Sequence, residues 1–227
     1  DDYRMDPRVP LVIPEVNGAA LKKHQGFISN PNCSTIIALM ALGPLHKAIG
    51  IRRFVACTYQ SVSGTGKAAI EELENQMKQY AAGKPVTHAV YPHQIALNLI
   101  PQIGGGKKEI PGWTSEEAKM VFETRKILGD PRIRVSATCV RVPVFLGHSE
   151  ALHVEFARPV TPEAVRKILG RAAGVKVVDD LAKAEYPVPL AVAGKDDVLV
   201  GRIRRDDSVK NGLILFVAGD NIRKGAA

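Results

Sequence analysis

The stretch "RIRVSATCVRVPVFLGHSEALHVEFARPV", residues 132–160, contains the clearest β-strand patterns of the chain. Residues 132–145 alternate apolar and polar side chains, which is the period of a β-strand. Residues 151–160 repeat that alternation and place their apolar side chains on one face. The stretch therefore predicts two strands of a sheet.

Three more stretches have strand character. They are "RRFVACTYQ" (52–60), "DVLVGRIRRD" (197–206) and "NGLILFVAGDN" (211–221), and the last two are predicted to be antiparallel neighbours. A shorter apolar stretch, "VPLVIPEVN" (9–17), contains two prolines and is predicted to be a strand or the approach to one.

Helices are predicted between these strands. Residues 67–83 and 114–129 consist of good helix formers and end in glycine, and a capping box opens the second. Residues 161–170 predict a short helix, and residues 34–49 a helix interrupted near Pro44. Because strands and helices do not alternate as βαβα, we predict an α+β fold with a mixed, largely antiparallel sheet and helices on one face.

Composition excludes several classes of protein. The chain has 227 residues, 45% of them hydrophobic, so it can bury a substantial core. No apolar run approaches the length of a membrane span, and the opening "DDYRMDPRVP" does not resemble a signal peptide. The three cysteines are too scattered for a disulfide framework or a zinc site. We therefore expect a protein of a reducing, cytoplasmic setting, with no membrane and no metal.

The net charge of +8 raises the question of whether the protein binds nucleic acid. The Lys and Arg residues are dispersed, aromatic residues make up only 5%, and no nucleic-acid motif is present. We expect no nucleic-acid partner. A small anionic substrate would also benefit from this positive field.

The stretch "ISNPNCSTIIALMAL", residues 28–42, places Cys33 after an Asn-Pro-Asn turn, where a helix is predicted to begin. Unpaired backbone N–H groups and the positive end of the helix dipole favour thiolate over thiol there, as a nucleophile requires. The alternative interpretation is a small buried residue that caps a turn.

The small-residue turn "SVSGTG", residues 61–66, superficially resembles a phosphate-binding loop. A Rossmann fingerprint needs a following strand with an acidic residue about 20 positions on, which "GKPVTHAVYP" does not provide, and the Walker pattern also fails. The backbone of this turn can still approach a ligand closely, and the alternative is a simple helix-entry turn.

Five other side chains are candidate partners for Cys33. His148 follows Gly147 where a strand is predicted to end, and a histidine can act as acid and base near neutral pH. Arg141, inside an apolar strand, must find an anion, and a carboxylate suits its fork. Gln60 ends a strand directly before the glycine turn. Glu116 and Lys119 share a helix face, although such a pair is commonly solvated surface.

A family resemblance extends over nearly the whole chain. It rests on "SNPNCSTI", "TYQSVSGTGKAAIEEL", "IPQI", "EEAKMVFETRKIL", "CVRVPVFLGHSE" and "NGLILFVAGDNIRKGAA". These stretches, in this order, resemble aspartate-semialdehyde dehydrogenase, and the fold that the resemblance implies is similar to the C-terminal domain of glyceraldehyde-3-phosphate dehydrogenase. The implied activity is NADPH-dependent reductive dephosphorylation of L-aspartyl 4-phosphate to L-aspartate 4-semialdehyde, in lysine, threonine and methionine biosynthesis.

The resemblance also implies residue roles. Cys33 matches the nucleophile that forms a thioester, His148 the acid/base, and Arg141 the clamp on the substrate α-carboxylate. Other implied substrate contacts are Asn32, Gln60 for the acyl group, Glu116 for the amine and Lys119 for phosphate. Implied contacts with the nicotinamide end of NADP(H) are Ser63, Gly64 and Asn221.

The resemblance implies that residues 1–227 form the catalytic and dimerisation part of such an enzyme. Residues 1–30 would lead from a nucleotide-binding domain, and residues 212–227 would return toward it. That domain would supply most of the NADP(H) site and an arginine for phosphate, so we expect the chain alone to be inactive. Expected small-molecule partners are the substrate and phosphate. The chain is also expected to bind further copies of itself and form a homodimer or a dimer of dimers.

Two alternatives remain open at this point. In the first, the chain is a non-catalytic dimerisation module that retains the site residues. In the second, it acts on a different acyl phosphate. The Arg-Val-Pro-Val-x-x-Gly-His-Ser motif at 141–149 argues against a different substrate.

Overall fold

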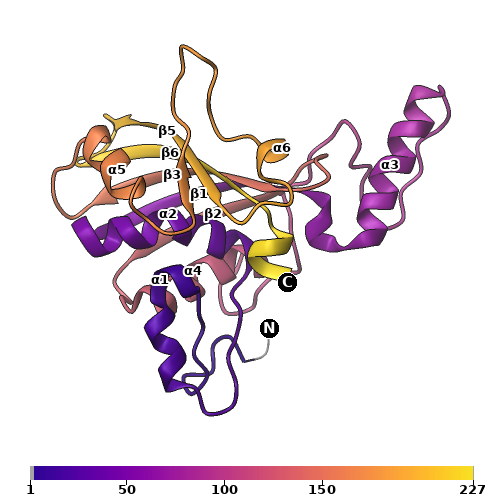
Figure 1. The fold of residues 1–227 in the computed structure, drawn as a ribbon. Helices are drawn as coiled ribbons and strands as arrows, with labels where there is room; N and C mark the ends of the chain where they lie inside the picture. The colour runs from indigo at the N-terminus through magenta and orange to yellow at the C-terminus, as the bar shows by residue number, and fades with distance from the viewer. Residues whose placement is uncertain (1–2, 227) are drawn as a thin grey trace.

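One six-stranded sheet organises the protein (Figure 1). The structure is a computed structural model that describes residues 3–226. The strands are β1 (Ile51–Gln60), β2 (Arg134–Arg141), β3 (His148–Phe156), β4 (Val175–Val177), β5 (Val198–Asp206) and β6 (Gly212–Gly219). Their order in the sheet is β2-β1-β3-β6-β5-β4.

The pairing confirms the predicted mixed sheet. β1 and β3, β3 and β6, and β5 and β6 are antiparallel, whereas β1 and β2 and the edge pair β4 and β5 are parallel. The late strands β5 and β6 are the antiparallel neighbours that the sequence predicts. Parallel β1 and β2 end together, with Gln60 opposite Arg141, and antiparallel β3 begins at His148 at that same end. Side chains from three strands are therefore brought together there.

Helix α2 (Cys33–Ile49) is the centre of the core and corrects one prediction. It is continuous through Pro44, where the sequence predicts an interruption. A proline inside a helix costs about 3 kcal/mol, but 12 of the 17 residues of α2 are buried. Gly43 lets Val16 pack closely against the helix, since a Cβ at position 43 would lie 2.7 Å from a Val16 methyl group. Tertiary packing therefore outweighs the local cost.

The other long helices are as the sequence predicts. They are α3 (Lys67–Ala81), α4 (Ser115–Leu128) and α5 (Pro162–Leu169). Thr114 and Glu117 form the capping box of α4, and Gly129 ends it with φ 66°. Thr161 caps α5 by accepting from the N–H of Ala164. Figure 1 shows α2 and α4 on the same side of the sheet.

Residues 9–17, predicted to be a strand or the approach to one, form no continuous strand: Leu11 makes an isolated β-bridge with Ser29, and a helix follows. Pro14–Asn17 is the short helix α1, and Gly18–Lys23 is the 3-10 helix η1. Proline at the first helical position favours a helix start, since its missing N–H has no partner there. Further short elements are η2 (Val62–Thr65), α6 (Pro189–Val192) and the terminal turn η3 (Ile222–Ala226).

Helix α4 holds residues 4–9, the leading segment, in place. Lys126 Nζ donates to three backbone carbonyls of this leading segment, those of Arg4, Asp6 and Val9, at 2.7–2.8 Å. Three acceptors satisfy the three donors of an ammonium group. The leading segment is thereby fixed against the helix that also faces the end of β1.

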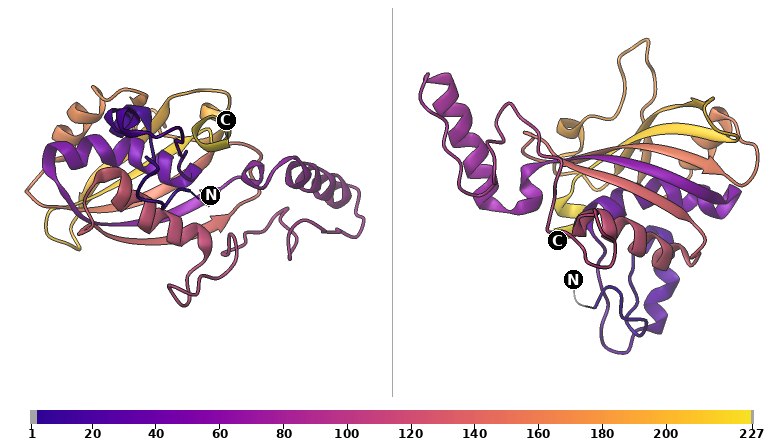
Figure 2. Two further views of the ribbon diagram at one scale, coloured as in Figure 1. Left: turned by 90° about the horizontal axis from the view of Figure 1, so that it is seen from below. Right: turned by 180° about the vertical axis from the view of Figure 1, so that it is seen from behind.

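Helix α3 forms an arm that stands away from the sheet (Figure 2). The arm has its own small core, which includes Val62, Leu73 and Ile95. Glu72 ties the returning loop to α3, because its carboxylate accepts from the N–H groups of Ala89 and Val90 at 2.6 Å.

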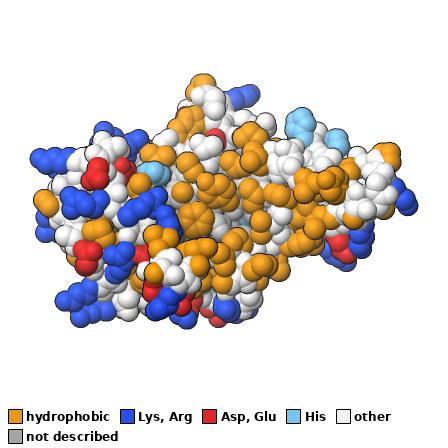
Figure 3. Space-filling view, turned by 90° about the horizontal axis from the view of Figure 1, so that it is seen from above, with side chains coloured by type: hydrophobic (Ala, Val, Ile, Leu, Met, Phe, Trp, Pro, Cys, Tyr) orange, Lys and Arg blue, Asp and Glu red, His pale blue; other side chains and the backbone are white. Residues whose placement is uncertain are grey.

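The two faces of the sheet differ. On β1, Phe54 and Ala56 point toward α2 and are fully buried, whereas Cys57 and Tyr59 point the other way and are partly exposed. Tyr59 lies 6.1 Å from Phe216 of β6, measured between ring centroids. Figure 3 shows apolar side chains gathered on the face seen from above, opposite α2. We call this the open face; α6 packs on it where β6 ends and β5 begins, through Val192 against Leu199 and Ala218.

Candidate active site around Cys33

A pocket of about 280 Å³ lies where α2 begins and where β1 and β2 end. All the site residues predicted from the sequence line it except His148: Asn32, Cys33, Gln60, Ser63, Gly64, Glu116, Lys119, Arg141 and Asn221. The structure therefore brings together residues that are separated by up to 189 positions in the chain, from Asn32 to Asn221.

Asn32 sets the start of the helix that carries Cys33. Its side-chain oxygen accepts from the N–H groups of Ser34 and Thr35, which makes it the N-cap. The terminal turn closes against the same point: a Cβ at Gly225 would lie 2.6 Å from the Cys33 Cβ, and Asn30 donates to the Gly225 carbonyl. Only glycine allows that approach.

The thiol of Cys33 differs from the expectation in its protonation. The cysteine stands at the helix terminus as predicted. However, burial raises the pKa of its thiol to about 12, with a smaller upward effect from Glu116. The backbone N–H of Ser34 and the charge of Arg141 act in the opposite direction but do not overcome burial. Cys33 is therefore a neutral thiol, and ionisation needs a further change in the pocket.

Glu116 connects three of the predicted residues. Its Oε1 accepts from Asn32 Nδ2 at 2.8 Å and from Gln60 Nε2 at 3.0 Å. Lys119, one turn further along α4, lies 3.7 Å from its other oxygen. Glu116 is buried, so the alternative of a solvated surface pair is wrong. Thr58 Oγ1 donates to the Gln60 oxygen, which fixes the amide orientation.

Arg141 lies against the glycine turn. Its Nη1 donates to the Ser61 carbonyl at 2.6 Å, and the residue is only 5% exposed. Among the described residues its Nε has no hydrogen-bond partner. A buried guanidinium with spare donors at a pocket wall favours a bound anion.

His148 lies behind the pocket wall, beneath Gly64. A Cβ at Gly64 would stand 3.2 Å from the His148 Nε2. The ring's Nδ1 accepts from the N–H of Ser61 at 3.0 Å, so the neutral ring carries its proton on Nε2. Burial, followed by the charge of Arg141, keeps its pKa well below the usual value. His148 begins β3, whereas the sequence places it after a strand.

Asn221 and Ser63 form the opposite side of this wall. The Asn221 side-chain oxygen accepts from Ser61 Oγ and from the N–H of Gly147, both at 3.0 Å. Ser63 Oγ and the Asn221 amide are also within 3.0 Å. This network holds the glycine turn against β6. Gly64 itself is exposed at the pocket, so its backbone is accessible to a ligand.

The comparisons with known proteins identify the relatives of this chain. Residues 42–224 match the family described as "Semialdehyde dehydrogenase, dimerisation domain". Aspartate-semialdehyde dehydrogenase of Aquifex aeolicus is 51% identical over 228 residues, which cover 99% of this chain. The chain belongs to the aspartate-semialdehyde dehydrogenase family. It spans about two thirds of the length of the curated relatives it matches, 66% for the Aquifex protein.

Solved structures of the aspartate-semialdehyde dehydrogenase family show the same fold. The crystal structure of aspartate-semialdehyde dehydrogenase II from Vibrio cholerae has a TM-score of 0.93 and 47% identity, covering 98% of this chain and 66% of that chain. A structure of that enzyme complexed with ASA is similar to the same degree, with a TM-score of 0.93. The Candida albicans enzyme with NADP has a TM-score of 0.73 and 27% identity, covering 100% of this chain and 65% of that chain.

Three residues at or near the pocket were not predicted from the sequence. Arg4 reaches the pocket from the leading segment. The resemblance had implied that an arginine for phosphate would come from the nucleotide-binding domain instead. Glu123 lies behind the pocket, on the same face of α4 as Glu116, and the seven-residue spacing was a usable signal. Glu150 on β3 is fully buried, and burial raises its pKa well above the usual value. An acidic residue among the apolar positions of a strand was its only signal.

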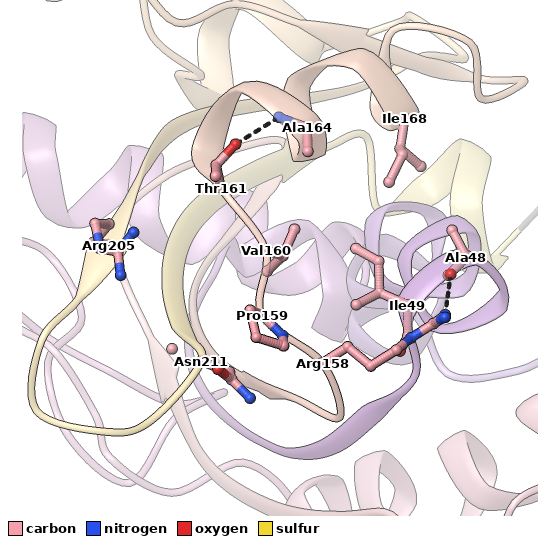
Figure 4. A pocket seen from close by; sticks show the side chains of 11 residues that line it. Ala48, Ile49, Arg158, Pro159, Val160, Thr161, Ala164, Ile168, Arg205 and Asn211 are labelled. Carbon is pink, nitrogen blue, oxygen red and sulfur yellow. Dashed lines mark hydrogen bonds between the residues drawn. The ribbon is translucent and has the colours of Figure 1, made fainter.

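A second hollow lies at the other end of α2 (Figure 4). It measures about 490 Å³ and is lined by residues that include Ile49, Arg158, Val160 and Arg205. Arg158 donates to the carbonyls of Ala48 and Ile49, so its guanidinium caps the end of α2. The arginine contacts here are structural, and the Thr161 hydroxyl at the hollow caps α5.

Residues 3–226 contain neither a metal-binding cluster nor a membrane-spanning helix. Within that range, no three His, Cys, Asp or Glu side chains lie close enough to bind a metal ion together. The helices in the same range are too short or too polar to span a bilayer.

Proposed function

We propose that this chain is the catalytic and dimerisation part of an aspartate-semialdehyde dehydrogenase. The proposed reaction is reductive dephosphorylation of L-aspartyl 4-phosphate to L-aspartate 4-semialdehyde with NADPH, in lysine, threonine and methionine biosynthesis and in the cytoplasm. The observation that supports it most is a cysteine at a helix terminus, in one pocket with the carboxylate of Glu116 and the cations Arg141, Lys119 and Arg4.

The charges of the pocket fit an acyl phosphate of an amino acid. Arg141 offers a fork for the α-carboxylate, and Glu116 offers a carboxylate for the amine. Arg4 and Lys119 line the same pocket and supply positive charge for the phosphate. Gln60 and Asn32, held by Glu116, keep amide groups near Cys33 for the acyl group. Two anion sites and one cation site match the three charged groups of the substrate.

The proposed first step is acyl transfer to sulfur. The Cys33 sulfur forms a bond with the acyl carbon, the bond from that carbon to the phosphate oxygen breaks, and the thiol proton leaves on the phosphate. Such a route suits a neutral thiol whose pKa is about 12. His148 is neutral with its proton on Nε2, so we propose that it donates a hydrogen bond from Nε2 to an oxygen that gains negative charge in this step.

Ser63, Gly64 and Asn221 are proposed to hold the nicotinamide end of NADPH. They form one wall of the Cys33 pocket, and Gly64 leaves its backbone accessible there. When bound, NADPH supplies the hydride that reduces the acyl group. We propose that a nucleotide-binding domain holds the rest of the cofactor, with residues 1–30 leading from it and residues 212–227 returning toward it.

The open face is the proposed dimer surface. The chain matches a dimerisation domain, and the open face leaves Tyr59 42% exposed beside Phe216. A homodimer, or a dimer of such dimers, would bury this apolar surface.

Mass spectrometry of the intact chain tests the proposed function. Incubation with L-aspartyl 4-phosphate should add one aspartyl group, and Cys33→Ala should carry none. Acetyl phosphate, which lacks the carboxylate and amine, is the control substrate and should react far more slowly. Without the rest of the cofactor site, we expect acylation but no measurable NADPH oxidation. A dimer that shows no adduct would support the alternative of a non-catalytic dimerisation module.

A further inference from the structure

Helix α4 directs two carboxylates toward the Cys33 pocket, and the proposed function uses only one. Glu116 lies in the pocket itself. Glu123, two turns further along the same face, is only 1% exposed. A buried carboxylate is costly unless it has partners, so its contacts indicate what it does.

Each oxygen of Glu123 has a different partner. Oε2 accepts from the backbone N–H of Asn32 at 2.7 Å, directly before Cys33. Oε1 accepts from Arg4 Nη1 at 3.2 Å. One carboxylate thus joins the turn that carries the nucleophile to a guanidinium that lines the same pocket.

Other contacts fix the backbone of Arg4 and the base of its guanidinium. Lys126 Nζ donates to the Arg4 carbonyl at 2.7 Å, and Arg4 Nε donates to the Asn30 carbonyl at 2.8 Å. Glu123 engages the Nη1 end of the guanidinium, so it helps to set the direction in which the guanidinium faces the pocket. A bidentate anion contact depends on that direction.

We propose that Glu123 is a positioning residue that holds the Arg4 guanidinium in register with the Asn32–Cys33 turn, so that a phosphate group and the thiol are presented to each other. This role rests on the proposed function for the anion site. It assigns no bond-making to Glu123, which acts through Arg4 and Asn32.

The substitution Glu123→Gln separates positioning from simple charge. The amide oxygen can still accept from the Asn32 N–H, but the amide nitrogen would face Arg4 as a second donor. If Glu123 only contributed negative charge near the pocket, its removal would tighten phosphate binding. If it positions Arg4, phosphate binding should weaken by about tenfold, the usual size for loss of a hydrogen bond to a charged group.

The measurement is protection of Cys33 by inorganic phosphate against iodoacetamide, followed by mass mapping of each cysteine. Asp179→Asn is the matched control, because Asp179 also joins an arginine, Arg166, to backbone N–H groups, those of Arg202 and Ile203, outside this pocket. The control should lower thermal stability and leave the phosphate affinity unchanged. Unchanged or tighter phosphate binding in Glu123→Gln overturns the proposal.

Two further measurements cover the remaining outcomes. Should Glu123→Gln not fold, Glu123→Asp keeps the charge but cannot reach both partners, and it should weaken phosphate binding too; wild-type affinity in it overturns the proposal. If phosphate fails to protect Cys33 in the wild type, the proposed anion site is wrong. In that case an alkylation rate of Cys33 in Glu123→Gln equal to that in Asp179→Asn also refutes Glu123 as an organiser of the turn.

Discussion

The two faces of one sheet serve different purposes in this protein. The face under α2 is buried along its whole length, yet its character changes along β1, from Phe54 and Ala56 to Thr58 and Gln60. On the open face, Cys57, Tyr59 and Phe216 are apolar side chains that are left partly exposed. The face covered by α2 thus forms a core within the chain and has a polar site at its end. The open face needs a second protein surface to bury its exposed apolar side chains.

The comparison shows where the protein accepts the cost of buried charge. Glu116, Glu123, Glu150, Arg141 and His148 are all buried around the end of the sheet where α2 begins. Elsewhere on that face the buried residues are apolar. Buried ionisable groups gathered at one pocket are typical of catalytic sites.

The largest effect is expected from the nucleophile. Cys33→Ala should abolish the covalent adduct with an acyl phosphate, since no thioester can form. Cys57→Ala, on the open face, is the matched control and should acylate at the wild-type rate. Cys139 should stay unlabelled in the native protein, because it is fully buried and, unlike Cys33, does not line the pocket. An adduct that persists in Cys33→Ala would remove the functional difference between the faces.

A charge on the open face should have the next largest effect. Phe216→Glu should weaken self-association by about 30-fold or more, because a buried interface aromatic commonly contributes about 2 kcal/mol. Sedimentation velocity over a concentration series measures it. Phe122→Glu makes the same change at an exposed position of α4, on the other side of the sheet, and should leave association unchanged. Equal effects in both would show that the open face is not the dimer surface.

Arg141→Lys changes the site at the end of the face that α2 covers, and its effect on acylation should be intermediate. A lysine is a point charge and cannot grip both a carboxylate and the Ser61 carbonyl. We expect acylation by L-aspartyl 4-phosphate to slow by about tenfold, through weaker binding, while acylation by acetyl phosphate changes little. Arg158→Lys, at the other end of α2, is the control and should leave both rates unaltered. Equal slowing with both substrates would contradict a carboxylate clamp.

The smallest effect concerns Glu150 and pH. Its pKa is raised in the folded state, first by burial and then by Glu116, so the folded protein keeps a proton that the unfolded chain releases. Stability should therefore fall as the pH rises from the ordinary glutamate pKa toward the raised value. Glu150→Gln should remove this component and flatten the dependence of the melting temperature on pH. An identical slope in wild type and variant would show that Glu150 is not held protonated.

Local signals in the sequence predicted most of the elements. The capping box of α4, the glycine that ends it and the Thr161 cap of α5 involve residues a few positions apart, so they are legible from the chain alone. Alternating patterns identified β2 and β3, and stretches of strand character identified β1, β5 and β6, for the same reason. Asn32 before Cys33 correctly indicated the start of α2.

The sequence by itself thus determined the mixed sheet, the long helices and a cysteine at a helix terminus. Only the tertiary structure decided that α2 runs through Pro44, that His148 lies behind Gly64, and that the Cys33 thiol is neutral. The contact from Arg4 to Glu123 joins residues 119 positions apart, as no local pattern could indicate. The physical reason is that propensity and capping act within one or two helical turns, whereas burial and electrostatic environment depend on which distant segments pack together.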